Sequence, residues 1–303
     1  MNGHESVDVV VTATAFMDLT FIGLESVPRP GEERFAGDLL RSPGGGAINA
    51  IGAARLGLRA ALAVPLGEDL EGGFIRDELE REGIALATGS GSRTPTTVVM
   101  PWGGERAMVT YEPGASTSAA QVAAFSPRAV IVALDQLDIV PAGARGYATC
   151  GDDDARAFRG HPPRDLDRAR ALFVNRREAL MLTGCDTAEE AAAQLGSEAE
   201  IAIVTLGPEG AMAFAGGRLT RAPGFPMDAV DTTGAGDLLC AAFVWADLAG
   251  AEAEVALQWA VLYGSLSVTV PTGAAGAVTL ERLLEEGNER GLPPLATREE
   301  TRT

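Results

Sequence analysis

One stretch in the C-terminal third of the chain combines small residues with carboxylates in a way that suits phosphoryl transfer. It spans residues 231–237, Asp-Thr-Thr-Gly-Ala-Gly-Asp, and leads directly into an apolar segment that predicts a buried helix. The first amides of a helix have no partner inside it, so they attract an anion, and glycines allow close approach. Asp237 could then accept the proton of an attacking hydroxyl, and the alternative is that Asp231 or Asp237 caps the helix.

A second glycine run, residues 43–49, precedes another expected helix at 47–56. Backbone groups of such a run can contact a ligand directly, and a flexible turn is the alternative. No glycine stands three residues beyond Gly46, so the pattern differs from the G-x-G-x-x-G of dinucleotide-binding folds.

Three weaker clusters place polar residues beside expected strands. Asn175 and Glu178 lie one helical turn apart, a pair that can hold hydrated Mg²⁺ or cap a helix. The loop 205–210 ends a strand and contains two glycines, which suits a ligand or a tight turn. Asp18 follows the first strand, where a carboxylate could bind substrate hydroxyls or face solvent.

The chain has no lysine, and all 24 of its basic residues are arginine. This excludes the usual forms of P-loop NTPases, protein kinases and Schiff-base enzymes, each of which needs a lysine. His4 stands in a terminus expected to fray and His161 precedes two prolines, which argues against a catalytic triad or a histidine-rich zinc site. Any chemistry therefore depends on carboxylates, arginines, hydroxyls and backbone amides.

Composition also narrows the partners and the compartment. The formal net charge is −18, which disfavours nucleic acid and anionic membranes as partners. The N-terminus lacks the basic region of a signal peptide, and no run of roughly 20 apolar residues predicts a membrane helix. Its 3 cysteines lack metal-ligand spacing, as is typical of a reduced, cytoplasmic protein.

Apolar strands alternate with helices through most of the chain, which predicts an α/β fold with a mainly parallel sheet covered on both faces. Strands are expected at 7–12, 35–40, 60–64, 96–100, 107–111, 129–133, 171–174 and 201–205. Helices are expected at 47–56, 74–82, 177–182, 188–195, 235–248 and 253–267. The segment 135–146 is too short for a good crossover helix, so we expect an irregular connection there. We expect one domain, 1–290, and a polar tail, 291–303.

Together these motifs resemble the ribokinase-like (PfkB-type) carbohydrate kinase family over about residues 7–286. The resemblance depends on segments 44–57 and 67–84, and above all on 231–237. It implies a three-layer α/β/α ribokinase-like fold with a small β lid drawn from about 19–40 and 96–111. It also implies an ATP-dependent kinase that transfers the γ-phosphoryl group to a hydroxyl of a sugar or sugar-like molecule.

The resemblance assigns roles to individual residues. Asp237 matches the family's catalytic base, and the anion hole matches Gly234, Ala235 and Gly236. The Asn-x-x-Glu motif for metal and phosphate matches Asn175 and Glu178, and the nucleotide loop matches Thr205, Gly207 and Gly210. The positions that bind the acceptor match Asp18, Gly44, Gly45 and Asn49. Arg106 stands where some members have an arginine that can swing over the phosphoryl group.

The family implies ATP and Mg²⁺ and, in some members, a monovalent cation such as K⁺ near Asp231 and the Gly273 loop. A homodimer formed through the lid is a further expectation. Many sugar kinases of the family have lysine or another polar residue where Gly46 stands, and the short 135–146 segment is a second departure. A nucleoside kinase of the same fold and a catalytically silent sugar- or nucleotide-binding protein remain as alternatives.

Overall fold

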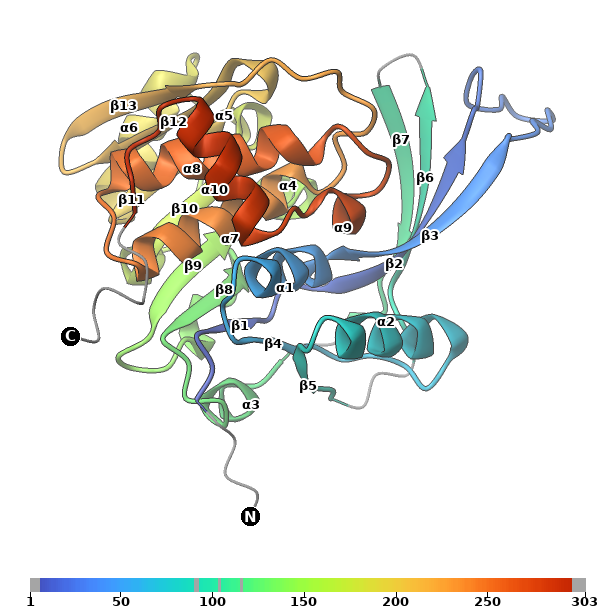
Figure 1. Cartoon of the computed structure of the whole chain (residues 1–303), viewed down its shortest axis with the longest axis horizontal. Helices are drawn as coiled ribbons and strands as arrows, with labels where there is room; N and C mark the ends of the chain where they lie inside the picture. Colours follow the sequence, from blue (N-terminus) through green and yellow to red (C-terminus); the bar gives the residue numbers. More distant parts are fainter. Residues whose placement is uncertain (1–5, 90–92, 103–104, 115–116, 296–303) are drawn as a thin grey trace.

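Nine strands of the described chain form one central sheet, in the order β13-β12-β11-β10-β9-β8-β1-β4-β5 (Figure 1). The computed structural model describes residues 6–89, 93–102, 105–114 and 117–295. The strands are β1 (Val9–Val11), β4 (Ala60–Ala63), β5 (Ala85–Ala87), β8 (Ala129–Ala133), β9 (Arg145–Thr149), β10 (Ala169–Asn175), β11 (Ile201–Thr205), β12 (Gly210–Ala215) and β13 (Arg218–Pro223). All pairs from β11 to β5 are parallel, and β12 and β13 add an antiparallel edge.

Helices cover both faces of this sheet because its central strands are apolar on both sides. In β1, Val9 and Val11 belong to one hydrophobic core and Val10 belongs to the other. The first core contains residues of α1 (Gly46–Arg55), α2 (Leu70–Arg81), α7 (Ala235–Leu248), α8 (Ala253–Ser267), α9 (Gly273–Gly276) and α10 (Leu280–Glu289). The second contains residues of α3 (Ala119–Ala123), α4 (Asp152–Ala157), α5 (Arg176–Thr183) and α6 (Ala188–Glu198). The result is the expected three-layer α/β/α arrangement.

Four further strands form a smaller sheet in the order β3-β2-β6-β7, which we call the lid. They are β2 (Ala15–Ile22), β3 (Asp38–Gly45), β6 (Thr96–Trp102) and β7 (Glu105–Tyr111). The lid projects from the main body beside α1 and α2 (Figure 1). Because β3 ends at Gly45 and α1 begins at Gly46, the glycine run joins the lid to the first helix.

The structure confirms most of the expected elements and corrects others. The strand expected at 35–40 begins at Asp38 and continues to Gly45, because Gly44 and Gly45 pair with Phe16 and Ala15 of β2. Several elements were not predicted at all: the β12–β13 hairpin, β2, β5, α3, α4 and α10.

The expected irregular connection at 135–146 is present as a short 3₁₀ helix, Leu137–Ile139, that leads into β9. The prediction for His4 and the part of the expected 291–303 tail beyond residue 295 lie outside the described residues. Within the described ranges, every helix is too short or too polar to cross a membrane.

A buried carboxylate fixes the C-terminal end of α7 to the sheet. Asp247 is 2% exposed. It accepts hydrogen bonds from Arg145 Nη1 at 2.6 Å and Arg170 Nη2 at 2.6 Å, and from the hydroxyl of Tyr147. Burial alone would raise its pKa, but the hydrogen bonds from Arg170, Tyr147 and Arg145 and the charge of Arg170 hold that pKa below its usual value. Since Arg145 and Arg170 stand at the starts of β9 and β10, α7 runs antiparallel to these strands.

We expect Asp247→Asn to lower the free energy of unfolding by about 2–3 kcal/mol at pH 7, because it leaves two arginines without a buried counter-charge. We expect a smaller loss of stability than for a fully buried ion pair, because the Arg145 side chain is 48% exposed. A carboxyl with a lowered pKa stabilises the fold above its unfolded pKa and loses that contribution as pH falls. The difference between wild type and variant should therefore shrink below about pH 4.

Urea unfolding at pH 7 and pH 3.5 measures both effects. Glu254→Gln is the matched control, because Glu254 pairs with Arg218 at 3.1 Å on the surface and should change stability far less. Equal stability of Asp247→Asn and wild type at pH 7 would contradict this prediction.

Candidate active site

Asp231 fixes the loop before α7 through hydrogen bonds from two backbone amides. Its carboxylate accepts from the Thr233 amide at 2.8 Å and from the Thr272 amide at 3.0 Å, which ties two distant loops together. Gly234 has φ 77°, and a Cβ there would lie 2.8 Å from Ile48 Cδ1, so only glycine fits. Gly234 is also the N-cap of α7 and makes no side-chain cap bond. The amides of Ala235 and Gly236 therefore start the helix without a capping side chain.

Asp237 lies in the first turn of α7 and contacts Asn49, a buried residue of α1. Asn49 Nδ2 donates to Asp237 Oδ1 at 2.7 Å. Asn49 Oδ1 is buried without a hydrogen-bond partner among the described residues. Burial raises the pKa of Asp237 to about 6, although the Asn49 hydrogen bond and the Arg106 charge act in the opposite direction. The Asp237 carboxylate is thus held by the amide nitrogen of Asn49, while the amide oxygen of Asn49 has no partner in the described part of the chain.

Asp18 forms the opposite wall of this space from the lid strand β2. A Cβ at Gly44 would lie only 2.2 Å from Asp18 Oδ2, so the glycine backbone lies directly against the carboxylate. Gly45 has φ 55°, which favours glycine at the junction of β3 and α1. Burial raises the pKa of Asp18 to about 7, helped by the charges of Asp237 and Asp231 and opposed by Arg106. Asp18 and Asp237 are therefore close enough to influence each other's protonation.

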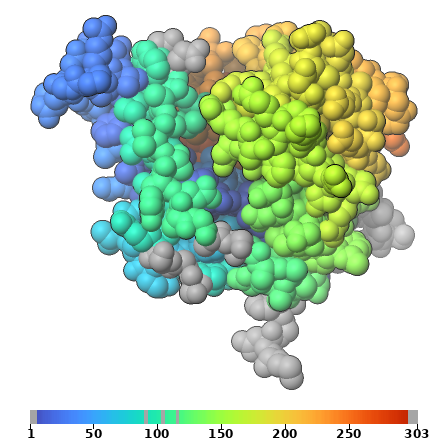
Figure 2. Space-filling view, turned by 180° about the vertical axis from the view of Figure 1, so that it is seen from behind, coloured from blue at the N-terminus to red at the C-terminus, as the bar shows by residue number. Residues whose placement is uncertain are grey.

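Arg106 connects the lid to the loop before α7. Its Nη1 donates to Thr232 Oγ1 at 2.7 Å, across 126 residues of sequence. The Arg106 side chain is exposed on β7, so it can leave this contact at little cost. Seen from behind, a hollow separates the lid from the lobe around residues 130–190, with N-terminal residues in blue at its floor (Figure 2).

A second group of candidate residues lies where β10 and β11 end. Asn175 and Thr205 are paired residues of these parallel strands. Asn175 is the N-cap of α5, and Glu178 is its capping-box partner: the Glu178 amide donates to Asn175 Oδ1 at 2.9 Å, and Asn175 Nδ2 donates to Glu178 Oε1 at 2.5 Å. Burial raises the pKa of Glu178 to about 7, Asp152 and Asp154 raise it further, and the Asn175 hydrogen bonds oppose them. Because α7 runs antiparallel to the strands, its N-terminus lies at this same edge of the sheet.

The two glycines after β11 differ in their surroundings. Gly210 has φ 99°, and a Cβ there would lie 2.1 Å from the Ala222 carbonyl, so this glycine allows the start of β12 to pack against the end of β13. Gly207 has φ 62° with open space around it, so its backbone can meet a ligand. Arg176 bridges to Glu209 at 2.6 Å and holds this loop beside α5. In the described part of the chain, no three His, Cys, Asp or Glu side chains converge as a metal cluster.

The structure thus gathers Asp18, Gly44, Gly45, Asn49, Arg106 and residues 234–237 around one hollow. The sequence analysis did not single out Thr232 or Thr272, both of which hold the loop before α7. Thr272 has φ 69°, a conformation that is uncommon outside glycine. Nothing local in the sequence marks this residue, because its partner Asp231 lies 41 positions earlier.

Comparison with known proteins agrees with this geometry. Residues 7–279 match the model of the pfkB family carbohydrate kinases. The ribokinase of Bacillus subtilis is 28% identical over 300 residues, covering 92% of this chain and 98% of that protein. The fructokinase of Klebsiella pneumoniae is 31% identical over 253 residues, covering 72% and 80%. The structure of Arabidopsis thaliana ribokinase with ribose and ATP superposes with a TM-score of 0.77 at 24% identity, covering 92% and 98% of the two chains. The chain therefore belongs to the pfkB family of carbohydrate kinases.

Proposed function

We propose that this kinase transfers the γ-phosphoryl group of ATP to a hydroxyl of a neutral sugar, with Asp237 as the catalytic base. The observation that supports it most is the position of the Asp237 carboxylate in the first, uncapped turn of α7, 2.7 Å from Asn49 Nδ2. Amides at the N-terminus of a helix stabilise phosphate charge, and a half-buried carboxylate beside them can accept a proton. The similar proteins named ribokinase and fructokinase make ribose and fructose the first acceptors to test.

In the proposed reaction, an acceptor hydroxyl lies between Asp237 and the γ-phosphate. The hydroxyl oxygen forms a bond to phosphorus, the bond from phosphorus to the β,γ-bridging oxygen breaks, and ADP leaves. The hydroxyl proton passes to Asp237 late, because phosphoryl transfer is loose and the hydroxyl becomes acidic as the new bond forms. The backbone amides of Gly234, Ala235 and Gly236 supply the anion hole, and no atom lies within 4 Å of the Cβ position of Gly236 to block an approaching phosphate.

Binding of the acceptor is assigned to Asp18, Asn49 and the backbone of Gly44 and Gly45. The buried Asn49 Oδ1 lacks a partner among the described residues, so an acceptor hydroxyl can satisfy it. Asp18 lies against the glycine backbone and can accept a second hydroxyl proton. Arg106 would leave Thr232 and pair with the transferring phosphoryl group, a role that suits a mobile guanidinium.

The nucleotide side is assigned to Asn175, Glu178, Thr205, Gly207 and Gly210. Asn175 and Glu178 fit Mg²⁺ through water molecules, because they offer oxygen ligands but no further carboxylate completes a cluster in the described chain. Bound Mg²⁺ would neutralise phosphate charge. A monovalent cation such as K⁺ near Asp231 is part of the same proposal, since the Asp231 carboxylate draws the loop at Thr272 close to the anion hole.

We also propose that a second copy of the chain covers the lid. Three large apolar side chains are exposed on the face of the lid that points away from Asp18: Leu39, Val109 and Tyr111. Such a patch on a small sheet is typical of a surface that a partner protein covers. A self-complementary dimer would shield it without blocking the opposite face of the lid.

We expect Asp237→Asn to lower kcat by about 10²- to 10⁴-fold, because the amide keeps the size but cannot accept the proton. ATP affinity should change little. ADP release, measured with ribose, fructose, other neutral sugars and nucleosides as acceptors, tests both the activity and the base. Asp228→Asn, an exposed aspartate in the preceding loop, is the matched control. A folded Asp237→Asn protein with near-normal kcat would falsify the assignment.

We expect kcat/KM to decrease as pH falls through about 6, because protonated Asp237 cannot act as a base and its pKa lies at about 6. Asp18 has a pKa of about 7, so the acid limb reports the pair of carboxyls. Asn49→Leu removes the hydrogen bond that opposes the rise, so its acid limb should move to higher pH. Weaker acceptor binding alone would lower kcat/KM at every pH without changing the pKa of the acid limb, so the pH profile separates the two effects. An unmoved acid limb would count against control of Asp237 by Asn49.

We expect Glu178→Gln to raise the Mg²⁺ concentration needed for half-maximal rate, because a neutral amide holds the hydrated ion less strongly. Glu190→Gln is the matched control, since Glu190 occupies the same capping-box position in α6. Rates measured across a Mg²⁺ titration at saturating acceptor give the comparison. If the two variants shift equally, Glu178 acts only as a helix cap.

A further inference from the structure

One arginine at the end of α1 is bonded to two other elements at once. Arg55 is the last residue of α1, and its side chain is 28% exposed. Its Nη2 donates to Glu82 Oε1 at 2.6 Å, and its Nε lies 3.1 and 3.2 Å from the two Glu82 oxygens. Its Nη1 donates to the Ala277 carbonyl at 2.6 Å and to the Ala274 carbonyl at 3.2 Å. Since all three nitrogens of the guanidinium are bonded, the side chain is held in one position.

The two carbonyls that Arg55 binds belong to the C-terminal end of α9, a single helical turn. The last carbonyls of a helix have no partner inside it, and a cation beside them stabilises that end. Here the cation comes from a different helix. The hydroxyl of Tyr263 donates to the Val278 carbonyl at 2.9 Å and holds the next residue of the chain. The end of α9 is therefore fixed to α1 and α8.

The other end of α9 is in contact with the proposed anion hole. The Thr272 amide, just before α9, donates to Asp231, which also accepts from the Thr233 amide. A Cβ at Gly273 would lie 2.9 Å from the Thr233 carbonyl and 3.0 Å from Gly234 Cα, so the two loops pack without room for a side chain. Because interiors this closely packed transmit strain, a displacement of α9 would also displace the loop that begins the anion hole.

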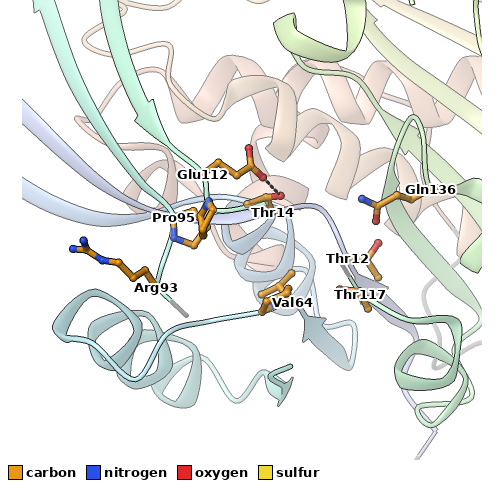
Figure 3. A pocket seen from close by; sticks show the side chains of 10 residues that line it. Thr12, Thr14, Val64, Arg93, Pro95, Glu112, Thr117 and Gln136 are labelled. Carbon is orange, nitrogen blue, oxygen red and sulfur yellow. Dashed lines mark hydrogen bonds between the residues drawn. The ribbon is translucent and has the colours of Figure 1, made fainter. Parts of the chain in front are cut away.

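The position of Glu82 is fixed by α2, which is tied to the base of the lid at its other end. Glu82 is the C-cap of α2, and Asp69 is its N-cap. Asp69 accepts from the Thr94 amide at 2.8 Å and from Thr94 Oγ1 at 2.5 Å. Figure 3 shows Arg93 and Pro95, which flank Thr94, in the segment that runs from α2 toward the lid strands. The helix therefore holds the carboxylate that orients the guanidinium.

A guanidinium suits this place better than an ammonium group does. Its planar fork binds a carboxylate through two nitrogens while the third reaches the carbonyls of another element. The hydrogen bond and the charge of Glu82 raise the pKa of Arg55, although burial opposes them, so the side chain stays charged.

We propose that Arg55, oriented by Glu82, is a positioning residue for the anion hole: by fixing α9, it keeps the loop 231–234 where its amides meet the transferring phosphoryl group. Arg55 acts through α9 and is assigned no contact with the reacting atoms. Its loss should weaken stabilisation of the transition state more than binding of the substrates, because the anion hole meets charge that develops during transfer. This inference rests on the proposed function.

The first test is Arg55→Lys, which keeps the charge but has one nitrogen in place of three. We expect kcat to fall by about 10- to 100-fold, because a small misplacement of aligned groups is costly, while KM for ATP and for the sugar changes little. Calorimetry should give ADP the same affinity as in wild type. Affinity for ADP with aluminium fluoride, which stands in for the transferring phosphoryl group, should fall by about the same factor as kcat. A purely structural role would lower the thermal stability without separating these two affinities.

A second readout needs no ligand. Deuterium exchange in Arg55→Lys should be faster than in wild type in the segments 231–236 and 272–278. Arg128→Lys is the matched control, because Arg128 also joins a carboxylate to a carbonyl: it donates to Asp8 Oδ1 at 3.3 Å and to the Leu248 carbonyl at 3.1 Å. Arg128 precedes β8, at the edge of the sheet opposite the anion hole, so kcat and exchange in the two segments should stay as in wild type.

Glu82→Gln should change kcat and the aluminium fluoride affinity in the same direction as Arg55→Lys. The double variant should be no worse than Arg55→Lys alone, since the two side chains act as one unit. If Arg55→Lys does not fold, Glu82→Gln decides by the same measurements.

Wild-type kcat in a folded Arg55→Lys protein would overturn the positioning role. Faster exchange confined to 272–278 would overturn it too, because the anion-hole loop would then keep its place without Arg55. If wild type phosphorylates no acceptor but binds ADP with aluminium fluoride more tightly than Arg55→Lys does, the proposed reaction fails and the positioning role stands. If wild type binds neither ADP nor ADP with aluminium fluoride, both fail.

Discussion

The hydrogen bond between Asn49 and Asp237 is the contact on which the candidate site depends, because it joins the two helices to which we assign the acceptor and the phosphate. It requires α1 and α7 to pack closely. A Cβ at Gly52 would lie 2.6 Å from Leu238 Cδ2 and 3.2 Å from Ala241 Cβ, so the glycine permits this approach. The far end of α7 is held by Asp247, which receives three cationic or hydroxyl donors from β9 and β10. With both ends fixed, the first turn of α7 keeps its amides aligned toward the hollow.

Several carboxylates lie around this hollow, and the charges of Asp237 and Asp231 raise the pKa of Asp18. Burial and neighbouring charge raise the pKa of both Asp18 and Asp237, so neither is as stable ionised as an exposed aspartate. In the proposed reaction, the hydroxyl protons of an acceptor and a phosphate-bound cation would both relieve that cost. Arg106 lowers both pKa values from the lid, so lid position and base strength are coupled.

The sequence predicted the main sheet well because buried parallel strands and apolar helices leave clear local patterns. The bounds expected for β8, β11, α7 and α8 agree with the structure. It did not predict the β12–β13 hairpin, whose glycines resemble a loop, or the full length of β3, which extends through glycines that pair with β2. The candidate site residues near glycines were predicted from local motifs and from the family resemblance. Thr272 and Thr232 were not singled out, because their contacts join segments far apart in the sequence.

Gly46 is a position at which this chain differs from many sugar kinases of the family, and the structure explains why it has no side chain. Family members often place lysine or another polar side chain there, but in this chain a Cβ at Gly46 would lie 2.0 Å from the Ala13 carbonyl. The connection from β1 to β2 therefore passes too close for any side chain. The same close passage positions Thr14 beside the Gly46 amide and lets its hydroxyl reach Glu112. Position 46 therefore offers only its backbone to the proposed acceptor site, and Thr14 is held by Glu112 beside it.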